Sequence, residues 1–194
     1  MLYKAFSANA TKIDSLVKPA NELLAKGRRV FVEGLREMQS GTDMYPDANF
    51  SMRLTYGKVL DYSPADAVEY NYVTTLDGVM AKEDPSNPEF VVPEKLKQLY
   101  KAKDYGRYGE NGKMIVGFLT NNDITGGNSG SPVMNGDGEL IGLAFDGNWE
   151  AISGDYAFEP ALQRTICVDI RYVLFVIEKY AGDTNLIKEL EIRN

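Results

Sequence analysis

Histidine is entirely absent from this sequence of 194 residues, and Cys167 is the single cysteine. Zinc sites in proteins draw mainly on these two residue types, and one cysteine cannot form an internal disulfide. We therefore expect neither a metal ion nor another cofactor. Because Cys167 lies within the apolar run Ile166-Cys167-Val168, the sequence favours a buried structural thiol over a reactive one.

Long apolar runs and an excess of positive charge are missing as well. A helix needs roughly 20 consecutive apolar residues to span a bilayer, and no run approaches that length. The formal net charge is −7 and the basic residues are scattered among acidic ones, which argues against nucleic acid as a partner. Residues 1–10 lack the basic and apolar regions of a secretory signal. The protein is therefore expected to be cytoplasmic or to begin inside a longer precursor.

The first third of the chain contains a segment with helical periodicity, followed by a segment with the alternation of a strand. Residues 11–38 carry apolar side chains at helical spacing, with the helix breaker Pro19 inside this range. This pattern predicts either a helical hairpin or one long bent helix. Apolar and polar residues then alternate from Phe50 to Tyr56, which is typical of a half-buried strand. We expect the β region to begin there.

The rest of the chain is predicted to form strands joined by loops and short helices. Strands are expected over 114–120 and 165–170, and a hairpin is expected where Asn135-Gly136-Asp137-Gly138 joins 133–134 to 140–145. Short helices are predicted over 74–82 and 93–103, and a final helix over 170–180. These helices would pack on a β core.

The segment Gly127-Asn128-Ser129-Gly130-Ser131-Pro132 places a serine between glycines, ahead of a tight turn and an apolar strand. Glycines let the backbone turn sharply, so that the amides of Gly127 and Ser129 can point at one spot where negative charge develops. The segment resembles the Gly-Asp-Ser-Gly-Gly-Pro motif of chymotrypsin-like serine peptidases. The resemblance implies that Ser129 is the nucleophile and that Gly127 contributes its amide to an oxyanion hole.

The segment departs from that motif at Asn128, where trypsin-like enzymes have an aspartate that pairs with an N-terminus freed by cleavage. No such activation step is expected here. A serine hydroxyl also needs a base, usually a histidine held by a carboxylate, and this chain has none. In chymotrypsin-like folds the histidine and aspartate come from the first of two barrels, so that half is expected to be missing. A Ser-Lys dyad is the other possibility, with Lys113 as the nearest preceding lysine.

Further distinctive segments extend along nearly the whole chain, at residues 45–50, 53–59, 74–79, 123–132, 142–150 and 163–174. Together they resemble serine-peptidase family 46, the bacterial dipeptidyl-peptidases of types 7 and 11. The resemblance implies a mainly β, chymotrypsin-like (trypsin-like) fold: the second β-barrel of a double-barrel peptidase, with an N-terminal helical segment and a C-terminal helix. Residues 1–44 would be the end of a helical capping domain, and residues 45–194 the barrel with its C-terminal helix.

The same resemblance assigns residues around Ser129. Asp146 matches the acidic residue that holds the free N-terminal amine of the substrate, although the pattern alone would favour a turn aspartate. Gly147 matches the position in the specificity pocket where acid-selecting members have arginine and hydrophobic-selecting members have glycine. Asp123 lies where trypsin keeps the acid that selects basic side chains, but acid-selecting members share this stretch, so we interpret Asp123 as structural.

Two functions remain open from the sequence. The first is a fragment of a serine dipeptidyl-peptidase with a hydrophobic preference at the penultimate residue, inactive by itself because it lacks histidine. The second is a noncatalytic trypsin-like domain that binds peptides or partner proteins. By resemblance, the expected partners are a peptide substrate, the missing N-terminal half that supplies the catalytic histidine and aspartate, and a second copy in a homodimer. The full-length protein would lie in the periplasm or at the cell surface.

Overall fold

A computed structural model describes residues 2–41, 51–154 and 157–193 of the chain, with only the backbone for residues 2–8. The chain separates into two compact units, residues 1–47 and residues 48–194. Within the described residues, no helix is both long enough and apolar enough to cross a membrane. The assignment of residues 1–44 to a capping domain stays a prediction.

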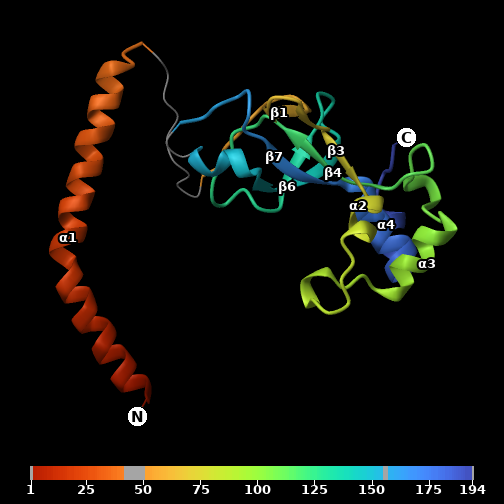
Figure 1. Cartoon of the computed structure of the whole chain (residues 1–194), viewed down its shortest axis with the longest axis horizontal. Coiled ribbons are helices and arrows are strands. Elements are labelled where there is room, and N and C mark those ends of the chain that lie inside the picture. Colours follow the sequence, from red (N-terminus) through yellow and green to blue (C-terminus); the bar gives the residue numbers. More distant parts are fainter. Residues whose placement is uncertain (1, 42–50, 155–156, 194) are drawn as a thin grey trace. The chain divides into compact units, whose positions relative to one another are not determined.

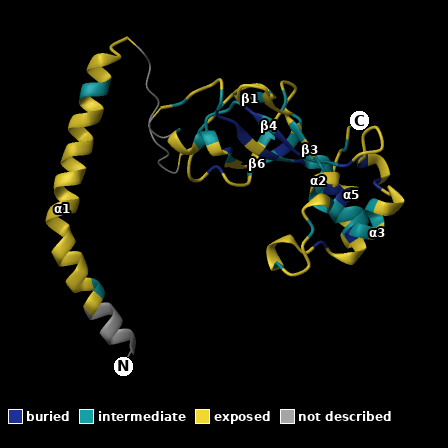
Figure 2. Ribbon diagram, in the orientation of Figure 1, coloured by how far each residue is buried: buried dark blue, intermediate teal, exposed yellow. Residues whose placement is uncertain are grey.

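The first unit contains one continuous helix, α1 (Leu2–Met38), which curves along its length (Figure 1). Pro19 lies inside it. A proline removes one backbone hydrogen bond and bends a helix without ending it when the flanking turns are sound. The bent long helix is therefore correct and the hairpin alternative is wrong. Figure 2 shows α1 exposed along almost all of its length, including an apolar stripe at helical spacing that comprises Ile13, Leu16, Val17, Leu23, Leu24, Val30 and Phe31.

A five-stranded antiparallel sheet forms the centre of the second unit, in the order β3-β4-β7-β6-β5. Its strands are β3 (Val73–Thr75), β4 (Ile115–Thr120), β5 (Ser131–Met134), β6 (Leu140–Gly147) and β7 (Thr165–Asp169). Strand β5 contains Pro132, which has no N–H to donate, and its place at the edge of the sheet accommodates that residue. The strands predicted over 114–120 and 165–170 are confirmed as β4 and β7, and the predicted hairpin is confirmed as β5 and β6.

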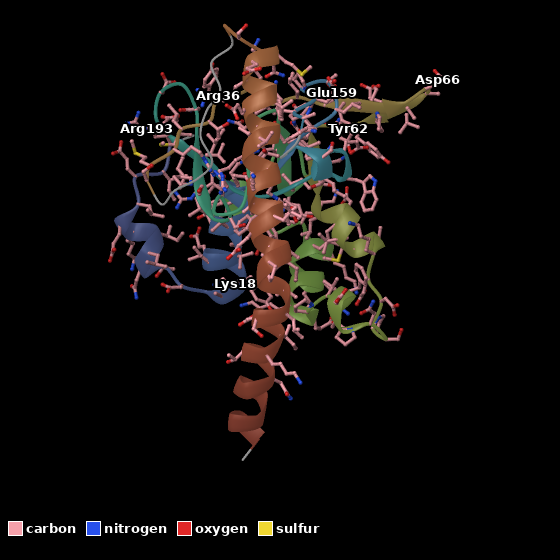
Figure 3. The ribbon with its side chains drawn as sticks, turned by 90° about the vertical axis from the view of Figure 1, so that its left-hand side faces the viewer. Lys18, Arg36, Tyr62, Asp66, Glu159 and Arg193 are labelled. Carbon is pink, nitrogen blue, oxygen red and sulfur yellow. The ribbon has the colours of Figure 1, made fainter. Side chains whose placement is uncertain are left out.

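A separate hairpin precedes the sheet in the chain. It pairs β1 (Tyr62–Ala65) with β2 (Val68–Tyr70), and its turn includes Ala67 with a positive φ of 60°. Asp66 lies at the tip of this projecting hairpin (Figure 3). Across the described residues the two sheets do not join into a closed barrel. The mainly β architecture is thus present as an open sheet with helices.

The strand predicted from Phe50 to Tyr56 is wrong for the residues that can be compared. Phe50 lies outside the described residues, and residues 51–57 are irregular. The apolar side of the alternation is nearly fully exposed, with Met52 at 99% and Tyr56 at 89%. Alternation predicts a strand only where a neighbouring strand and a core are available, and sheet contacts begin at the bridge between Val59 and Thr120.

Most helices of the second unit lie together, past one end of strands β3 and β4 (Figure 1). They are α2 (Leu76–Ala81), η1 (Pro88–Phe90), α3 (Glu94–Ala102), η2 (Gly106–Tyr108), α4 (Ile170–Phe175), the π-helix η4 (Val176–Ala181) and α5 (Asn185–Glu189). The larger apolar core lies among them, centred on the fully buried Leu76, Met114 and Phe175. The predicted helices over 74–82, 93–103 and 170–180 are therefore confirmed with shifts of a few residues, the last as α4 followed by η4.

A smaller core within the sheet comprises Phe118, Ala144 and Cys167. Cys167 is 1% exposed, and burial raises the pKa of its thiol to about 11. The thiol is therefore protonated at neutral pH and buried, as expected for a structural residue.

Candidate active site

Ser129 lies in the loop between β4 and β5 and is docked onto strand β6. Its Oγ donates a hydrogen bond to the carbonyl oxygen of Phe145 at 3.1 Å, and the amide of Gly130 donates to the carbonyl of Ala144 at 2.7 Å. Strand β6 has an irregular register between Ala144 and Asp146, where Phe145 is the extra residue. Such bulges redirect neighbouring groups. The hydroxyl of Ser129 is thereby held beside Phe145, near the end of β6, while Ser129 itself stays exposed.

The loop around Ser129 has the sharp backbone that the glycines predict. Gly127 has φ of +97° and Gly130 has φ of +81°, values in the left-handed region that favours glycine. Within the described part of the chain, the amides of Gly127 and Ser129 donate no hydrogen bond to a backbone carbonyl. Two free amides in such a turn suit an oxyanion. The oxyanion hole itself stays a prediction.

A pocket of about 300 Å³ opens beside Ser129, a size at the lower end of small-ligand sites. Three of the predicted site residues, Ser129, Asp146 and Gly147, line this one pocket, whereas Gly127 does not. Asp123 also lines it. Most of the other walls come from the loop before Gly127, from η3 (Trp149–Ser153) and from the segment that leads into β7.

Gly147 forms a part of the wall that has no room for a side chain. A Cβ atom at this position would lie 2.8 Å from the Cβ of Ala151 in η3. Contacts that short do not occur between carbon atoms, so any larger residue requires η3 to move. The wall at Gly147 is therefore backbone, and it carries no charge.

Asp146 is the residue that the sequence leaves open between a turn aspartate and an anchor for the substrate amine, and its role as an anchor stays a prediction. Its Oδ1 accepts a hydrogen bond from the amide of Gly147 at 2.8 Å, as a turn aspartate does. The residue is nevertheless exposed and lines the pocket beside Ser129. Its carboxylate thus lies where a substrate amine could reach it.

The pocket wall is fixed by buried polar residues that the sequence analysis did not identify. Asn148 joins the end of β6 to the segment before β7 through its side chain. Its Nδ2 donates to the carbonyl of Leu162 at 2.8 Å, and its Oδ1 accepts from the backbone amide of Arg164 at 2.8 Å. Gln163 donates to the carbonyl of Ala157 at 3.0 Å. No local pattern marks these residues, since their partners are 6 to 16 positions away.

Arg164 is 5% exposed and lines the pocket, yet its guanidinium donates hydrogen bonds to main-chain carbonyls. It also lies 5.7 Å from the ring centre of Tyr62 in β1, which Figure 3 labels. The guanidinium thus connects the pocket wall to the hairpin. The carbonyl acceptors belong to Asp61, Pro160, Ala161 and Gln163.

Asn128, the neighbour of Ser129, is also buried, at 9% exposure. Its Oδ1 accepts hydrogen bonds from Nη2 of Arg53 and from the amide of Thr125, the latter at 3.2 Å. Arg53 was not predicted to have a role. Its only sequence signal is its place on the polar side of the alternation over 51–56.

The described residues that line the pocket include no lysine that could serve as a base for Ser129. The backbone of Lys113 pairs with Glu110 in a turn before β4. The Ser-Lys dyad therefore gains no support. In the part of the chain that the structure describes, no cluster of three or more histidine, cysteine, aspartate or glutamate residues could hold a metal ion.

Comparisons with known proteins identify the family. The sequence model of Peptidase S46 matches residues 2–192. Dipeptidyl-peptidase 7 of Phocaeicola vulgatus is 61% identical over 188 residues, which cover 93% of this chain and 26% of that protein. The Asp/Glu-specific dipeptidyl-peptidase of Porphyromonas gingivalis is 51% identical over 182 residues, which cover 93% of this chain and 25% of that protein.

Solved structures give the same result. Porphyromonas endodontalis DPP11 in complex with the dipeptide Arg-Asp matches with a TM-score of 0.80 and 50% identity, over 88% of this chain and 25% of that chain. This similarity confirms the expected fold class, and this chain spans about a quarter of the length of the relatives. Because the family model covers all but three of the 194 residues in a continuous match (2–192), the chain belongs to peptidase family S46.

Proposed function

We propose that this chain is the C-terminal, nucleophile-bearing portion of a serine-type dipeptidyl-peptidase that releases dipeptides from free N-termini. The observation that carries the proposal is that Ser129, Asp146 and Gly147 line one pocket in a chain of family S46. The relatives are named dipeptidyl-peptidases. These three residues would supply the nucleophile, the amine anchor and the specificity wall.

In this mechanism, Oγ of Ser129 attacks the carbonyl carbon of the scissile bond. The hydroxyl proton passes to a histidine contributed by a part of the protein outside this chain, since this chain has no histidine. The negative charge that develops on the carbonyl oxygen is stabilised by the amides of Gly127 and Ser129. The scissile C–N bond then breaks as the histidine gives its proton to the leaving amine, and water, deprotonated by the same histidine, hydrolyses the acyl-enzyme and restores the hydroxyl of Ser129.

Asp146 would set the length of the product. A carboxylate that pairs with the substrate's ammonium group fixes how many residues extend from the N-terminus to the scissile bond. Strand β6 holds Ser129 through Phe145 and carries Asp146 next to it. The distance from nucleophile to anchor is therefore set by one strand, which suits the release of units of constant length.

The pocket favours an apolar side chain at the penultimate residue. Its wall at Gly147 is uncharged, and Ile124, Phe145, Ile152 and Phe158 contribute apolar surface. The guanidinium of Arg164 already donates to several main-chain carbonyls, whereas Asp123 and Asp146 add negative charge. A substrate carboxylate would be desolvated there without a cationic partner, which is costly.

The experiment is to assay the intact enzyme on dipeptidyl substrates that end in Met, Phe, Leu, Asp and Glu. The apolar set should be cleaved with the highest kcat/KM. Asp146→Ala should raise KM on free N-termini by roughly tenfold or more, since a charge-assisted contact is lost, while N-acylated peptides stay poor substrates. Best cleavage after Asp or Glu would contradict the preference, and unchanged KM in the variant would remove Asp146 from the site.

The noncatalytic binding domain is the second candidate, and the absence of histidine from the chain is the observation that favours it. A fluorophosphonate probe applied to the intact protein separates the two. Covalent labelling that Ser129→Ala abolishes requires a base and supports the enzyme. By resemblance, we also propose that the intact protein is a homodimer located in the periplasm or at the cell surface.

A further inference from the structure

The residue next to the nucleophile is anchored from a distant part of the chain. Asn128 is polar but only 9% exposed, and its Oδ1 accepts a hydrogen bond from the guanidinium of Arg53. The two residues are 75 positions apart. Hydrogen bonds from a charged donor are stronger than those between neutral groups, so this contact contributes to the stability of the loop conformation.

Asn128 also organises the turn on both sides of Ser129. Its amide donates to the carbonyl of Thr125 at 3.2 Å, and its Oδ1 accepts from the amide of Thr125 at 3.2 Å. Its carbonyl accepts from the amide of Ser131 at 2.9 Å. The turn from Thr125 to Ser131 is therefore held together through the main chain and side chain of Asn128.

The glycines on either side cannot supply this order by themselves. Gly127 and Gly130 have positive φ, and an added Cβ would meet nothing within 4 Å at either position. Glycine has access to many backbone conformations, so a loop rich in it needs contacts elsewhere to hold one of them. The contact between Asn128 and Arg53 meets that need, because the guanidinium comes from a residue 75 positions away in the sequence and so fixes the loop to a separate part of the fold.

We propose that Arg53 is a positioning residue for catalysis: through Oδ1 of Asn128 it holds the amides of Gly127 and Ser129 in the arrangement that stabilises the oxyanion. The inference rests on the proposed peptidase function and adds a residue to it. In trypsin-like enzymes, the aspartate at this position pairs with an N-terminus freed by cleavage. Here the residue is Asn128, and the side chain of Arg53 takes the place of that N-terminus. Arg53 does not touch substrate in this role and acts through the loop.

The test uses the intact enzyme with Arg53→Met and Arg53→Lys. Arg193→Met is the matched control, because Arg193 is an exposed arginine paired with Glu139 and Glu191 (Figure 3). Loss of one oxyanion donor lowers kcat by about 10² to 10³. In Arg53→Met the two amides are displaced and not removed, so kcat should fall by a smaller factor, about 10- to 100-fold. KM should change by less than about threefold and Arg53→Lys should recover part of kcat, whereas Arg193→Met should match the wild type.

A peptide boronic acid supplies a readout that a merely structural role would not change. Its tetrahedral adduct with Ser129 needs the oxyanion amides, whereas a product dipeptide does not. In Arg53→Met the boronate should bind more weakly by about the same factor as kcat/KM falls, with unchanged affinity for the dipeptide. Equal weakening of both ligands would mean a general loss of structure and would overturn the proposal.

A double-mutant cycle with Asn128→Ala keeps the proposal falsifiable if Arg53→Met unfolds at a lower temperature. The two substitutions should be non-additive, since either one breaks the same contact. Additive losses, or a wild-type kcat in both Arg53→Met and Arg53→Lys, would refute the positioning role. An intact wild-type protein without dipeptidyl-peptidase activity would instead refute the function on which the inference rests.

Discussion

Gly147 shows how one missing side chain can define a binding surface. Because a Cβ here would lie 2.8 Å from Ala151, the wall consists of backbone facing η3. A sequence comparison treats glycine and arginine at this position as alternatives, but the structure shows that the larger residue needs space that Ala151 occupies. The shape of the pocket wall at this position therefore depends on two residues together.

We predict that Gly147→Ala lowers kcat/KM of the intact enzyme on Met and Phe substrates by roughly tenfold, because η3 must shift into the pocket. Combining it with Ala151→Gly should recover most of that loss by removing the short contact. Gly78→Ala is the control, since Gly78 lies in a helix and an added Cβ there meets nothing within 4 Å. A Gly147→Ala enzyme as active as wild type would show that η3 adapts freely, and Gly147→Arg would then be expected to fit as well.

Residues with distant partners were the ones that the sequence could not identify. Ser129 and Gly127 were predicted because glycine and serine at fixed spacing carry their own backbone signal. Asn148, Arg164 and Arg53 have no such signal, since each is significant only through partners that folding brings close. A buried asparagine and an exposed one look alike in a sequence.

At the level of elements, Arg164 connects the segment before β7 to the chain that enters β1. Its guanidinium donates to the carbonyl of Asp61 at 2.7 and 3.1 Å and to the carbonyl of Pro160 at 2.8 Å. Two segments about 100 residues apart in sequence are thus joined at the pocket wall. Loss of the guanidinium would leave several carbonyls without a donor.

Arg164→Met should therefore lower stability by about 3 kcal/mol and the midpoint of thermal unfolding by roughly 6 to 12 °C. KM for apolar substrates should rise as well, because the wall loses its support. Differential scanning calorimetry of the intact enzyme and steady-state kinetics measure the two effects. With Arg193→Met as the exposed control, equal midpoints for the two variants would show that the buried hydrogen bonds contribute little.

The elements predicted correctly share a local cause. The hairpin from β5 to β6 follows from an Asn-Gly turn between apolar strands, and α3 follows from Pro93 and a one-sided apolar pattern. The irregular course of residues 51–57 could not be predicted, because alternation does not reveal whether a neighbouring strand is present. Closure into a barrel is a property of the whole sheet and has no local signal.

At the scale of the whole molecule, the chain carries the loop of the proposed nucleophile Ser129 and a pocket beside it, but no histidine. The isolated 194-residue chain should not measurably hydrolyse dipeptidyl substrates, since the loss of the base costs on the order of a million-fold in rate. The assay compares the pure chain with its Ser129→Ala variant. Turnover that the variant abolishes would mean that a base has been overlooked among the residues of this chain.

The docking of Ser129, the proposed nucleophile, onto β6 has a consequence for how the family could diversify. Ser129 and Gly130 are held by the carbonyls of Phe145 and Ala144, which every residue type possesses. Asp146 and Gly147, which follow directly, line the pocket in which the proposed substrate would bind. Mutation could therefore change these pocket-lining positions while the hydroxyl of Ser129 keeps its place. The names of two relatives, at 61% and 51% identity, fit this view, since only the second specifies Asp and Glu.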